Sequence, residues 1–345
     1  MFEIQNDWPD MKSFVISIDQ KDFTLKKTDS GYVSTDSSLY VETISQTAFS
    51  IQYGTSRCRF ICPSRNLDIH GGESVNCIAV SEDGDEILSG DSSGKVFLSH
   101  KSDEPIPLFG HCPGLDVEDC EISNPLGLFI TCGGDMQVIC YSSKEYQYIG
   151  KLSGHLRSVT SIGSNNGMIY SGSLDGTIRK WDPTKFRTVS SSLVGKPVTD
   201  FCFGVNAIYV STEDFVGAID SRSEQLLFAF QNNESEIFNC IAQNNNDIVS
   251  GTEDGKIFVW DNRASDKPKI EWKWYDSSIN SLKSYNNEFW VCTNEGISAS
   301  LDLNRKCFTT ILGTTKYEPV RNICFAGEKC WTSASNGIIK SFLLQ

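Results

Sequence analysis

A pattern that recurs seven times, about every forty residues, constrains the fold of this chain more than any other feature. In each copy a tight turn separates two strand-like runs, and the first turn residue falls at positions 93, 135, 175, 214, 254, 295 and 336. An apolar residue stands at a nearly constant distance before each turn, at Val75, Val117, Val159, Val198, Phe238, Ile279 and Val320. We call these seven apolar residues the ladder residues. Two series of positions with the same spacing along most of the chain indicate seven copies of one structural unit.

The clearest copy runs from Ile169 to Asp182 and contains Asp175-Gly176 before a Trp-Asp ending. Its apolar and polar residues alternate with period two, as in half-buried antiparallel strands, and Asp-Gly supplies the positive φ of a tight hairpin. A unit of about forty residues with this ending is typical of the four-stranded WD40 blade. Because one blade cannot bury both of its faces, the sequence predicts an all-β, seven-bladed WD40 β-propeller.

The two ends of the repeat array predict how the ring closes. The chain ends at Gln345, directly after the third strand of the last copy, so a segment before the first copy must supply the fourth strand. We expect residues 57–62 to be this closing strand, and residues 57–345 to form the propeller. Residues 1–56 lie outside the repeat, and alternation at Phe14–Ile18 predicts a small β-rich N-terminal extension.

Composition narrows the classes of partner. The formal charge of −14 disfavours nucleic acid and anionic membranes as partners, because proteins bind both mainly through Lys and Arg. No apolar run approaches the roughly 18 residues of a membrane span, and the acidic N-terminus does not resemble a signal peptide. Thirteen cysteines, mostly in apolar runs, favour reduced thiols in a cytoplasmic, possibly also nuclear, protein. We expect a monomer without cofactor or metal, since no His or Cys cluster has zinc spacing.

Polar residues at fixed positions of the repeat predict structural hydrogen-bond networks. They are His111, Thr131, Asp135 and Tyr141 in the second copy, His155, Ser171, Asp175 and Trp181 in the third, and Ser250, Asp254 and Trp260 in the fifth. A His–Asp–Ser set resembles a catalytic triad, but its recurrence in register with the repeat favours a structural role. Residues 90–94 likewise imitate a nucleophile elbow, and together with Lys95 a phosphate-binding loop, yet they occupy the strand and turn of the first copy. We therefore expect that this protein is not an enzyme.

Acidic residues gather in the loops expected on one face of the ring, called here the top face, where the turns and the loops between copies emerge. This predicts a partner-binding surface on loops held by a rigid scaffold, with two phenylalanines as apolar anchors, although Phe238 could equally be core. The predicted surface comprises Glu73, Asp116, Glu118, Glu213, Asp214, Phe215, Glu234, Glu236, Phe238, Glu253 and Glu318.

Segments over the whole chain resemble the proteasomal ATPase-associated factor family. They are Ile4–Trp8, Ser173–Trp181, Ile237–Cys240, Gly251–Gly255, Asp261–Arg263 and Glu318–Val320. The resemblance implies a non-enzymatic assembly chaperone that binds the C-terminal domains of the AAA ATPase subunits of the proteasome base and regulates 19S and 26S assembly. An acidic top face would suit a basic ATPase domain.

Three alternatives remain open at this point. Residues 260–263 fit the W-D-x-R box of substrate receptors of cullin–RING ubiquitin ligases. A generic WD40 interaction scaffold would need none of the particular segments above. A hydrolase would need Ser92 or His155 in a catalytic arrangement, so a buried His155, or a Ser92 without a nearby histidine, would count against it.

Overall fold

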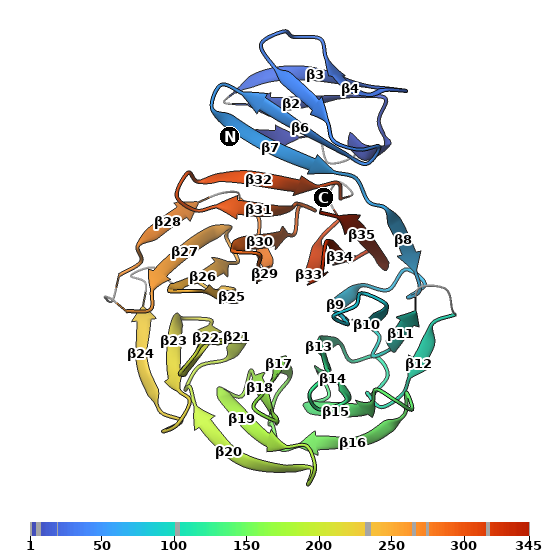
Figure 1. Ribbon diagram of the computed structural model, residues 1–345. Coiled ribbons are helices and arrows are strands. Elements are labelled where there is room, and N and C mark those ends of the chain that lie inside the picture. The colour runs from blue at the N-terminus through green and yellow to red at the C-terminus, as the bar shows by residue number, and fades with distance from the viewer. Residues whose placement is uncertain are drawn as a thin grey trace.

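The chain folds into seven four-stranded antiparallel blades around a central channel (Figure 1), and the sheet of one blade continues into three N-terminal strands. The computed structural model describes residues 2–4, 8–18, 20–100, 104–231, 236–263, 267–273, 276–314 and 318–344. Within these ranges the structure is built from strands, with one short 3-10 helix, η1 (Trp8–Asp10). The predicted seven-bladed β-propeller is confirmed.

Each blade runs from an inner strand at the channel to an outer strand at the rim. The first three blades are β9 (Val75–Val80), β10 (Glu86–Asp91), β11 (Val96–His100) and β12 (Ile106–Leu108); β13 (Val117–Ser123), β14 (Leu128–Gly133), β15 (Gln137–Ser142) and β16 (Tyr148–Ser153); β17 (Val159–Asn165), β18 (Met168–Ser173), β19 (Thr177–Asp182) and β20 (Arg187–Leu193). Blades four to six are β21 (Val198–Phe203), β22 (Ala207–Thr212), β23 (Phe215–Asp220) and β24 (Leu226–Gln231); β25 (Phe238–Asn244), β26 (Asp247–Thr252), β27 (Lys256–Asp261) and β28 (Ile270–Lys273); β29 (Ile279–Tyr285), β30 (Glu288–Thr293), β31 (Ser298–Asp302) and β32 (Cys307–Leu312).

The seventh blade combines both ends of the repeat array. Its inner strands are β33 (Val320–Ala326), β34 (Lys329–Ala334) and β35 (Ile338–Leu343), and its outer strand is β8 (Arg65–Asp68), which pairs antiparallel with β35. The chain therefore closes the ring with an N-terminal strand, as expected, but the prediction that residues 57–62 form this strand is wrong. Those residues lie in a different sheet.

Strand spacing explains this correction. The outer strand of each blade begins a short and nearly constant way before the inner strand of the next blade; for example, β16 begins at Tyr148 and β17 at Val159. Strand β8 begins at Arg65 and stands in the same relation to Val75, where blade one begins. Strand β7 (Ser56–Ile61) begins about twice as far before Val75, which is too early to occupy the same position. The connection between blades thus has a nearly fixed length, and of the two strands only β8 satisfies it.

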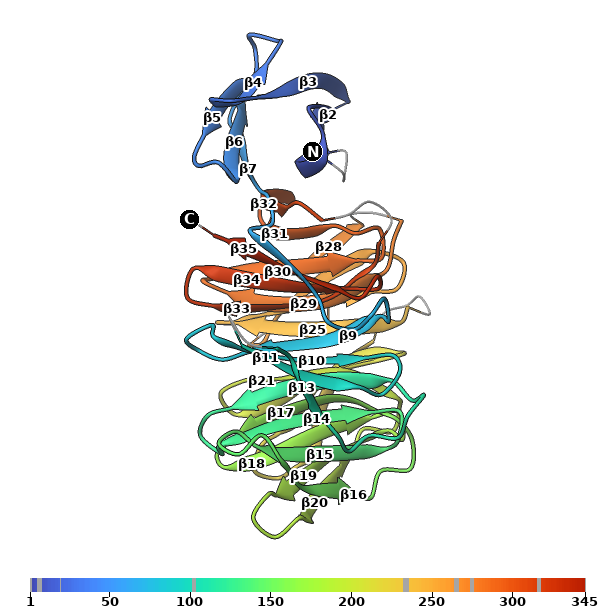
Figure 2. The ribbon, with the colours of Figure 1, turned by 90° about the vertical axis from the view of Figure 1, so that its right-hand side faces the viewer.

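The N-terminal residues form a separate small unit beside the rim of blade six (Figure 2). A four-stranded meander of β1 (Phe2–Ile4), β2 (Ser13–Ile18), β3 (Lys21–Thr28) and β4 (Gly31–Ser34) is followed by an antiparallel set, β5 (Tyr40–Thr43), β6 (Ala48–Tyr53) and β7. Strand β7 pairs in parallel with β32, so the sheet of blade six continues into this unit. The boundary between unit and propeller therefore lies after Ile61, not after residue 56.

An aromatic cluster holds this N-terminal unit together. Trp8 is buried against Phe14, Phe49 and Phe60, with ring centroids 5.3 to 5.9 Å apart, in edge-on or tilted geometries. Such pairs contribute about 0.5–1.5 kcal/mol each beyond the burial of their area. The cluster is continuous with the core of blades five and six, which fixes the unit on the propeller.

The seven apolar residues of the sequence ladder begin the seven inner strands, and all are buried between neighbouring blades. Directly after each ladder residue, the pairing of the inner strand with its neighbour skips one residue. Such a β-bulge leaves one residue of the inner strand unpaired and redirects its side chain. The bulge recurs at the same place in every blade, so it places seven side chains at equivalent positions around the channel.

Candidate functional site in the central channel

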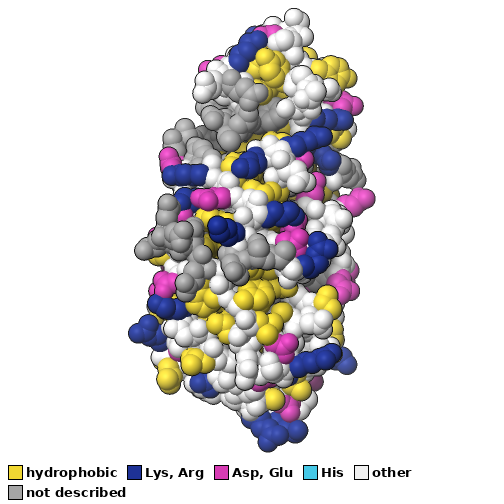
Figure 3. Space-filling view, turned by 90° about the vertical axis from the view of Figure 1, so that its left-hand side faces the viewer, with side chains coloured by type: hydrophobic (Ala, Val, Ile, Leu, Met, Phe, Trp, Pro, Cys, Tyr) yellow, Lys and Arg dark blue, Asp and Glu magenta, His cyan; other side chains and the backbone are white. Residues whose placement is uncertain are grey.

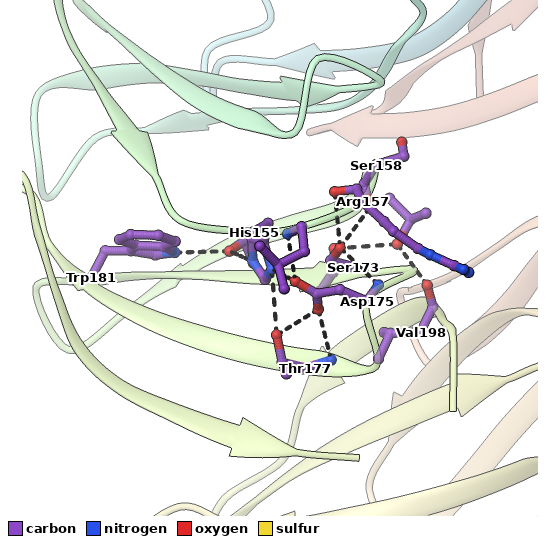
Figure 4. A network of polar contacts seen from close by, with 12 residues as sticks. His155, Arg157, Ser158, Ser173, Asp175, Thr177, Trp181 and Val198 are labelled. Carbon is purple, nitrogen blue, oxygen red and sulfur yellow. Dashed lines mark hydrogen bonds and ion pairs between the residues drawn. The ribbon is translucent and has the colours of Figure 1, made fainter. Parts of the chain in front are cut away.

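Hydrogen-bond networks join the loops of the top face to the blades beneath them. In blade three, His155 Nδ1 lies 2.8 Å from Asp175 Oδ2 and its Nε2 lies 2.7 Å from Ser171 Oγ, while Trp181 Nε1 donates to the same Oγ at 2.8 Å (Figure 4). Every donor in this chain meets an acceptor if Nδ1 carries the imidazole proton. The predicted set is present and fully bonded.

Protonation follows from the same geometry. Burial lowers the pKa of His155, although Asp175 opposes this, so the imidazole is neutral at pH 7. Burial alone would raise the pKa of Asp175, but hydrogen bonds from Thr177, the Leu156 N–H and His155 hold it below its ordinary value. A neutral imidazole whose acceptor nitrogen is occupied by Ser171 is a structural contact, and both ring nitrogens are inaccessible to solvent.

The second blade has the same arrangement. His111 Nδ1 lies 2.9 Å from Asp135 Oδ2, and Nε2 lies 2.8 Å from Thr131 Oγ1. Tyr141 is buried at the position of the tryptophan, but its hydroxyl has no hydrogen-bond partner among the described residues. The tyrosine therefore fills the site of Trp181 without completing the chain.

The network predicted for blade five does not form. Ser250 donates to the backbone carbonyl of Cys240, Asp254 accepts from Thr252, and the indole N–H of the buried Trp260 has no partner among the described residues. The reason is the absence of a histidine in this blade, because His links the hydroxyl to the carboxylate in the other two. The prediction for Ser250, Asp254 and Trp260 is corrected accordingly.

A third network lies in blade one and was missed in the sequence. His70 Nδ1 lies 2.7 Å from Asp91 Oδ2, and Nε2 lies 2.8 Å from Ser89 Oγ. Ser89 stands four residues before the turn position 93, as Ser171 does before 175, but the carboxylate comes two residues earlier than in the other copies. His70 also lacks the preceding glycine of His111 and His155, which hid the match.

The seven bulge residues form a ring around the top of the channel, called here the channel ring. All seven line one cavity of about 480 Å³, and all seven are polar: Asn76, Glu118, Thr160, Thr199, Asn239, Asn280 and Arg321. The ladder residues that precede them are apolar and buried. This alternation directs one polar side chain per blade toward the channel.

In four successive blades the channel-ring side chain forms a cross-blade hydrogen bond. Thr160 donates to the carbonyl of Val198 at 2.8 Å, and Thr199 donates to that of Phe238 at 2.5 Å. The side-chain amides of Asn239 and Asn280 donate to the carbonyls of Ile279 and Val320 at 3.3 and 2.9 Å. Blades three to six are thus each bonded to the next by the same position, and the acceptor is always the ladder residue of the next blade.

The remaining three blades, seven, one and two, depart from this pattern. Their channel-ring residues, called here the open arc, are Arg321, Asn76 and Glu118, and none of these side chains bonds to the ladder carbonyl of the next blade. Among the described residues, Arg321 and Glu118 have no hydrogen-bond or ion-pair partner at all, and Arg321 Nε is buried and unsatisfied. When Glu118 is ionised it has no proton to donate and cannot form the cross-blade bond.

Deeper in the channel, two further carboxylates do have a structural role. Asp119 accepts from the Ile162 N–H of the next blade at 2.9 Å, and Asp200 accepts from the Ile241 N–H at 3.1 Å. Burial raises the pKa of Asp200 to about 6, against the opposing effect of Lys283. Burial would lower the pKa of Lys283, but the charges of Asp200 and Asp119 outweigh it and raise the pKa.

Glu118 is the carboxyl group of the open arc, and its pKa is strongly perturbed. Burial raises its pKa from 4.5 to about 7, and the neighbouring charges of Asp116 and Asp119 add to the effect, while Arg321 opposes it. The protein thus keeps a carboxylate in a half-buried position where its charge is poorly compensated. Perturbed groups of this kind gather at binding and catalytic sites.

The structure brings together only part of the predicted acidic surface. Asp116 and Glu118 line the cavity, and Glu73, Glu213, Asp214 and Glu253 are exposed on top-face loops. Asp214 forms an ion pair with Lys196. Glu318 accepts a hydrogen bond from Asn336, and Glu234 lies outside the described residues. Binding of a partner by the exposed members stays a prediction.

Three members of the predicted surface are corrected. Phe238 is fully buried and Phe215 nearly so, and both pack in the core between blades, so neither can anchor a partner. Glu236 is also buried and forms an ion pair with Lys256. Phe238 is itself a ladder residue, and the six other ladder positions already indicated a core role.

Exposed apolar side chains on the top face were missed. Leu115 and Met136 are each 43% exposed and Leu156 is 78% exposed, next to Asp116 and the turns of blades two and three. Met136 occupies, with φ of 63°, the turn position that is glycine in blade three. Apolar residues in such loops were the available signal. A second apolar area lies over β24 on the side of the ring, where Leu226 and Leu227 are exposed (Figure 3).

The structure also shows where the residues lie on which the ligase-receptor and hydrolase alternatives depend. Arg263, in the W-D-x-R box, is exposed and forms a bidentate contact of 3.1 Å with Asp261 two residues earlier. Ser92 donates to Glu73, whereas the nearest networked histidine, His70, bonds to Ser89. The described residues contain no group of His, Cys, Asp and Glu that could hold a metal ion. No described helix is long and apolar enough to cross a membrane.

Comparison with known proteins agrees with the fold. The sequence pattern of the family described as "WD domain, G-beta repeat" matches residues 61–98, 146–182 and 224–261. Each match contains the outer strand of one blade and the first three strands of the next; the first one includes β8. Seven blades, three of them with a networked histidine, and these repeats define a WD-repeat β-propeller. Such repeats are those of protein-interaction scaffolds.

Among named relatives, the chain is similar to the "Probable proteasomal ATPase-associated factor 1" of Dictyostelium discoideum, with 24% identity over 152 residues, 40% of this chain and 36% of that protein. It is 28% identical over 109 residues to "WD repeat domain-containing protein 83" of Rattus norvegicus, covering 30% of this chain and 34% of that one. An uncharacterised WD repeat-containing protein of Schizosaccharomyces pombe is 29% identical over 125 residues, 34% of this chain and 42% of the other. The matches span about a third to two fifths of these relatives.

Proposed function

We propose that this protein is a non-enzymatic scaffold that binds an ATPase subunit of the proteasome base through its top face and regulates assembly of the regulatory particle. The observation that carries the proposal is the similarity to the Dictyostelium discoideum protein named as a probable proteasomal ATPase-associated factor. The segments named in the sequence support it over the length of the chain. The C-terminal domain of the ATPase is the proposed contact.

The top face suits such a partner physically. Asp116 lines the cavity, Glu73 and Glu253 are exposed on other top-face loops, and exposed Leu115 and Leu156 add apolar contact area on this face. Interfaces commonly combine apolar anchors with a charged rim, and the charges increase the rate of encounter. A basic surface on the ATPase domain would therefore meet complementary charge here.

Affinity purification tests the proposal. The tagged full chain is expressed in its own cells, and the bound proteins are quantified by mass spectrometry. Recovery of base ATPases without 20S subunits is expected. Recovery of a ligase adaptor in their place, or of no proteasome subunit, would contradict the proposed function and leave a scaffold with other partners.

A matched pair of variants localises the contact. The top-face variant Glu73→Lys, Asp116→Lys, Glu253→Lys is expected to lose most of the bound ATPase. The control Glu82→Lys, Glu145→Lys, Glu328→Lys makes the same change of charge at exposed positions in the loops of the opposite face. Equal loss of ATPase from both variants would mean that net charge alone, rather than the top face, governs binding.

A further inference from the structure

The channel ring contains two kinds of residue that occupy equivalent backbone positions. In blades three to six the side chain is Thr, Thr, Asn and Asn, and each forms a cross-blade hydrogen bond. In blades seven, one and two the side chain is Arg, Asn and Glu, without that bond. The three exceptions are consecutive around the ring, because blade seven adjoins blade one through β33 and β9. The open arc is therefore one continuous part of the cavity wall.

The cost of this departure indicates a role other than folding. A cross-blade bond to a buried carbonyl contributes about 0.5–1.5 kcal/mol in a typical case, and the open arc forgoes it three times. It also places a guanidinium and a carboxylate in the cavity wall with no hydrogen-bond or ion-pair partner among the described residues, and burial leaves Arg321 Nε unsatisfied. Threonine and asparagine form this bond in the other four blades, whereas the open arc has Arg321 and Glu118 at two of its three positions.

We propose that the open arc binds a short peptide segment that carries a basic side chain beside a carboxylate, with the basic group at Glu118 and Asp116 and the carboxylate at Arg321. The inference rests on the proposed function, a partner protein bound at the top face, and names the chemistry of the segment that enters the channel. A cavity of about 480 Å³ has room for a few residues of extended chain.

The ligand class follows from the order of groups along the arc. Arg321 offers planar donors that match a carboxylate, and Glu118, with the exposed Asp116 beside it, offers acceptors for an ammonium or guanidinium. Asn76 lies between them. Its side-chain oxygen accepts from Ser74 at 3.1 Å, and its NH₂ group, which has no acceptor among the described residues, can donate to a peptide carbonyl. A purely basic or purely acidic segment would leave one end of the arc unpaired.

Binding of defined peptides to the full chain tests this inference, measured by fluorescence anisotropy at pH 8. Three fluorescein-labelled, C-terminally amidated hexapeptides are compared: Gly-Gly-Lys-Asp-Gly-Gly, and its versions with Gly in place of Asp or of Lys. A fourth peptide, Gly-Gly-Gly-Gly-Gly-Lys, has a free C-terminus, so that the carboxylate comes from the chain end. Preference for the first peptide indicates a side-chain carboxylate, and preference for the fourth a chain terminus; either supports the proposal.

Two variants restore the pattern of the other blades. Glu118→Thr and Arg321→Asn supply donors for the missing cross-blade bonds, so both are expected to fold with unchanged or higher Tm while losing peptide affinity about ten-fold or more. The controls Glu145→Thr and Arg222→Asn make the same replacements at exposed positions of the opposite face and are expected to leave affinity unchanged.

Three results would overturn the proposal. They are no binding of any of the four peptides, binding of a peptide with only one charge that is as tight as binding of the Lys-Asp peptide, and unchanged affinity in both open-arc variants. These results are separable from failure of the proposed function. Peptide binding uses no proteasome subunit, and ATPase recovery by affinity purification with the Glu118→Thr variant reports on the partner independently.

Discussion

Replacing Glu118 by glutamine is expected to stabilise the protein at pH 8. The ordinary pKa of this carboxyl group is 4.5, and in the folded protein burial and the charges of Asp116 and Asp119 raise it to about 7, with Arg321 opposing. At roughly 1.4 kcal/mol per pH unit, ionising Glu118 in the folded chain costs about 3 kcal/mol more than in the unfolded chain. Glutamine has nearly the same shape and does not ionise.

The pH dependence distinguishes this cause from a general effect of the substitution. Between pH 4.5 and about 7 the folded chain holds a proton on Glu118 that the unfolded chain has released, so the free energy of unfolding of the wild type falls as pH rises through this window. Above pH 7 both states are ionised and the loss is complete. The difference between the variant and the wild type should thus be small at pH 5 and reach about 3 kcal/mol at pH 8.

Urea unfolding followed by tryptophan fluorescence at pH 5, 6, 7 and 8 measures this difference. Glu145→Gln, at an exposed position, is the control and should change the free energy of unfolding by no more than about 0.5 kcal/mol at any of these pH values. A Glu118→Gln effect that is constant from pH 5 to pH 8, or that destabilises at pH 8, would refute the assignment of an uncompensated carboxylate. A residue that destabilises the fold and is nevertheless present agrees with a binding role.

Three further predictions follow from the blades. Trp181→Phe removes a hydrogen bond to Ser171 whereas Trp260→Phe removes none, so chemical denaturation should find the first variant less stable by about 1 kcal/mol more than the second. A chain lacking residues 1–62 keeps the closing strand and should retain one cooperative thermal transition in calorimetry, at reduced Tm; a chain lacking residues 1–68 should lose that cooperativity, and equal behaviour of the two would place closure elsewhere. Arg263→Ala, at an exposed residue paired within its own turn, should change the free energy of unfolding by less than about 0.5 kcal/mol in urea.

The periodic part of the fold was predictable because every blade solves the same packing problem. Each ladder residue must be apolar to fill the space between two blades, and each tight turn needs residues that adopt its backbone angles. Phe215 was misassigned because it was expected in a loop, whereas it begins β23. For Phe238 two roles were left open, and the core role agrees with its place among the ladder residues. Position within the repeat was a better guide to burial than residue type.

The channel ring could not be derived from the sequence in the same way. Its members differ in chemistry from blade to blade, and the bulge that directs them into the channel is a property of strand pairing rather than of residue type. Only the hydrogen bonds distinguish Asn280, which bonds to the next blade, from Asn76, which does not. The prediction of the closing strand was wrong for a simpler reason: residues 57–62 are strand-like, but they lie too far before the first blade for the connection that every blade shares.

Closure by β8 and β35 also sets an order of events during synthesis. The strand Arg65–Asp68 leaves the ribosome about 270 residues before its partner Ile338–Leu343, which corresponds to a delay of roughly 14–55 s at about 5–20 residues per second. Throughout that interval blade seven does not exist and blade one has an uncovered apolar face. Until β35 has been made, the nascent chain therefore exposes this face to aggregation and to chaperones, and the ring stays open however well the first six blades have folded.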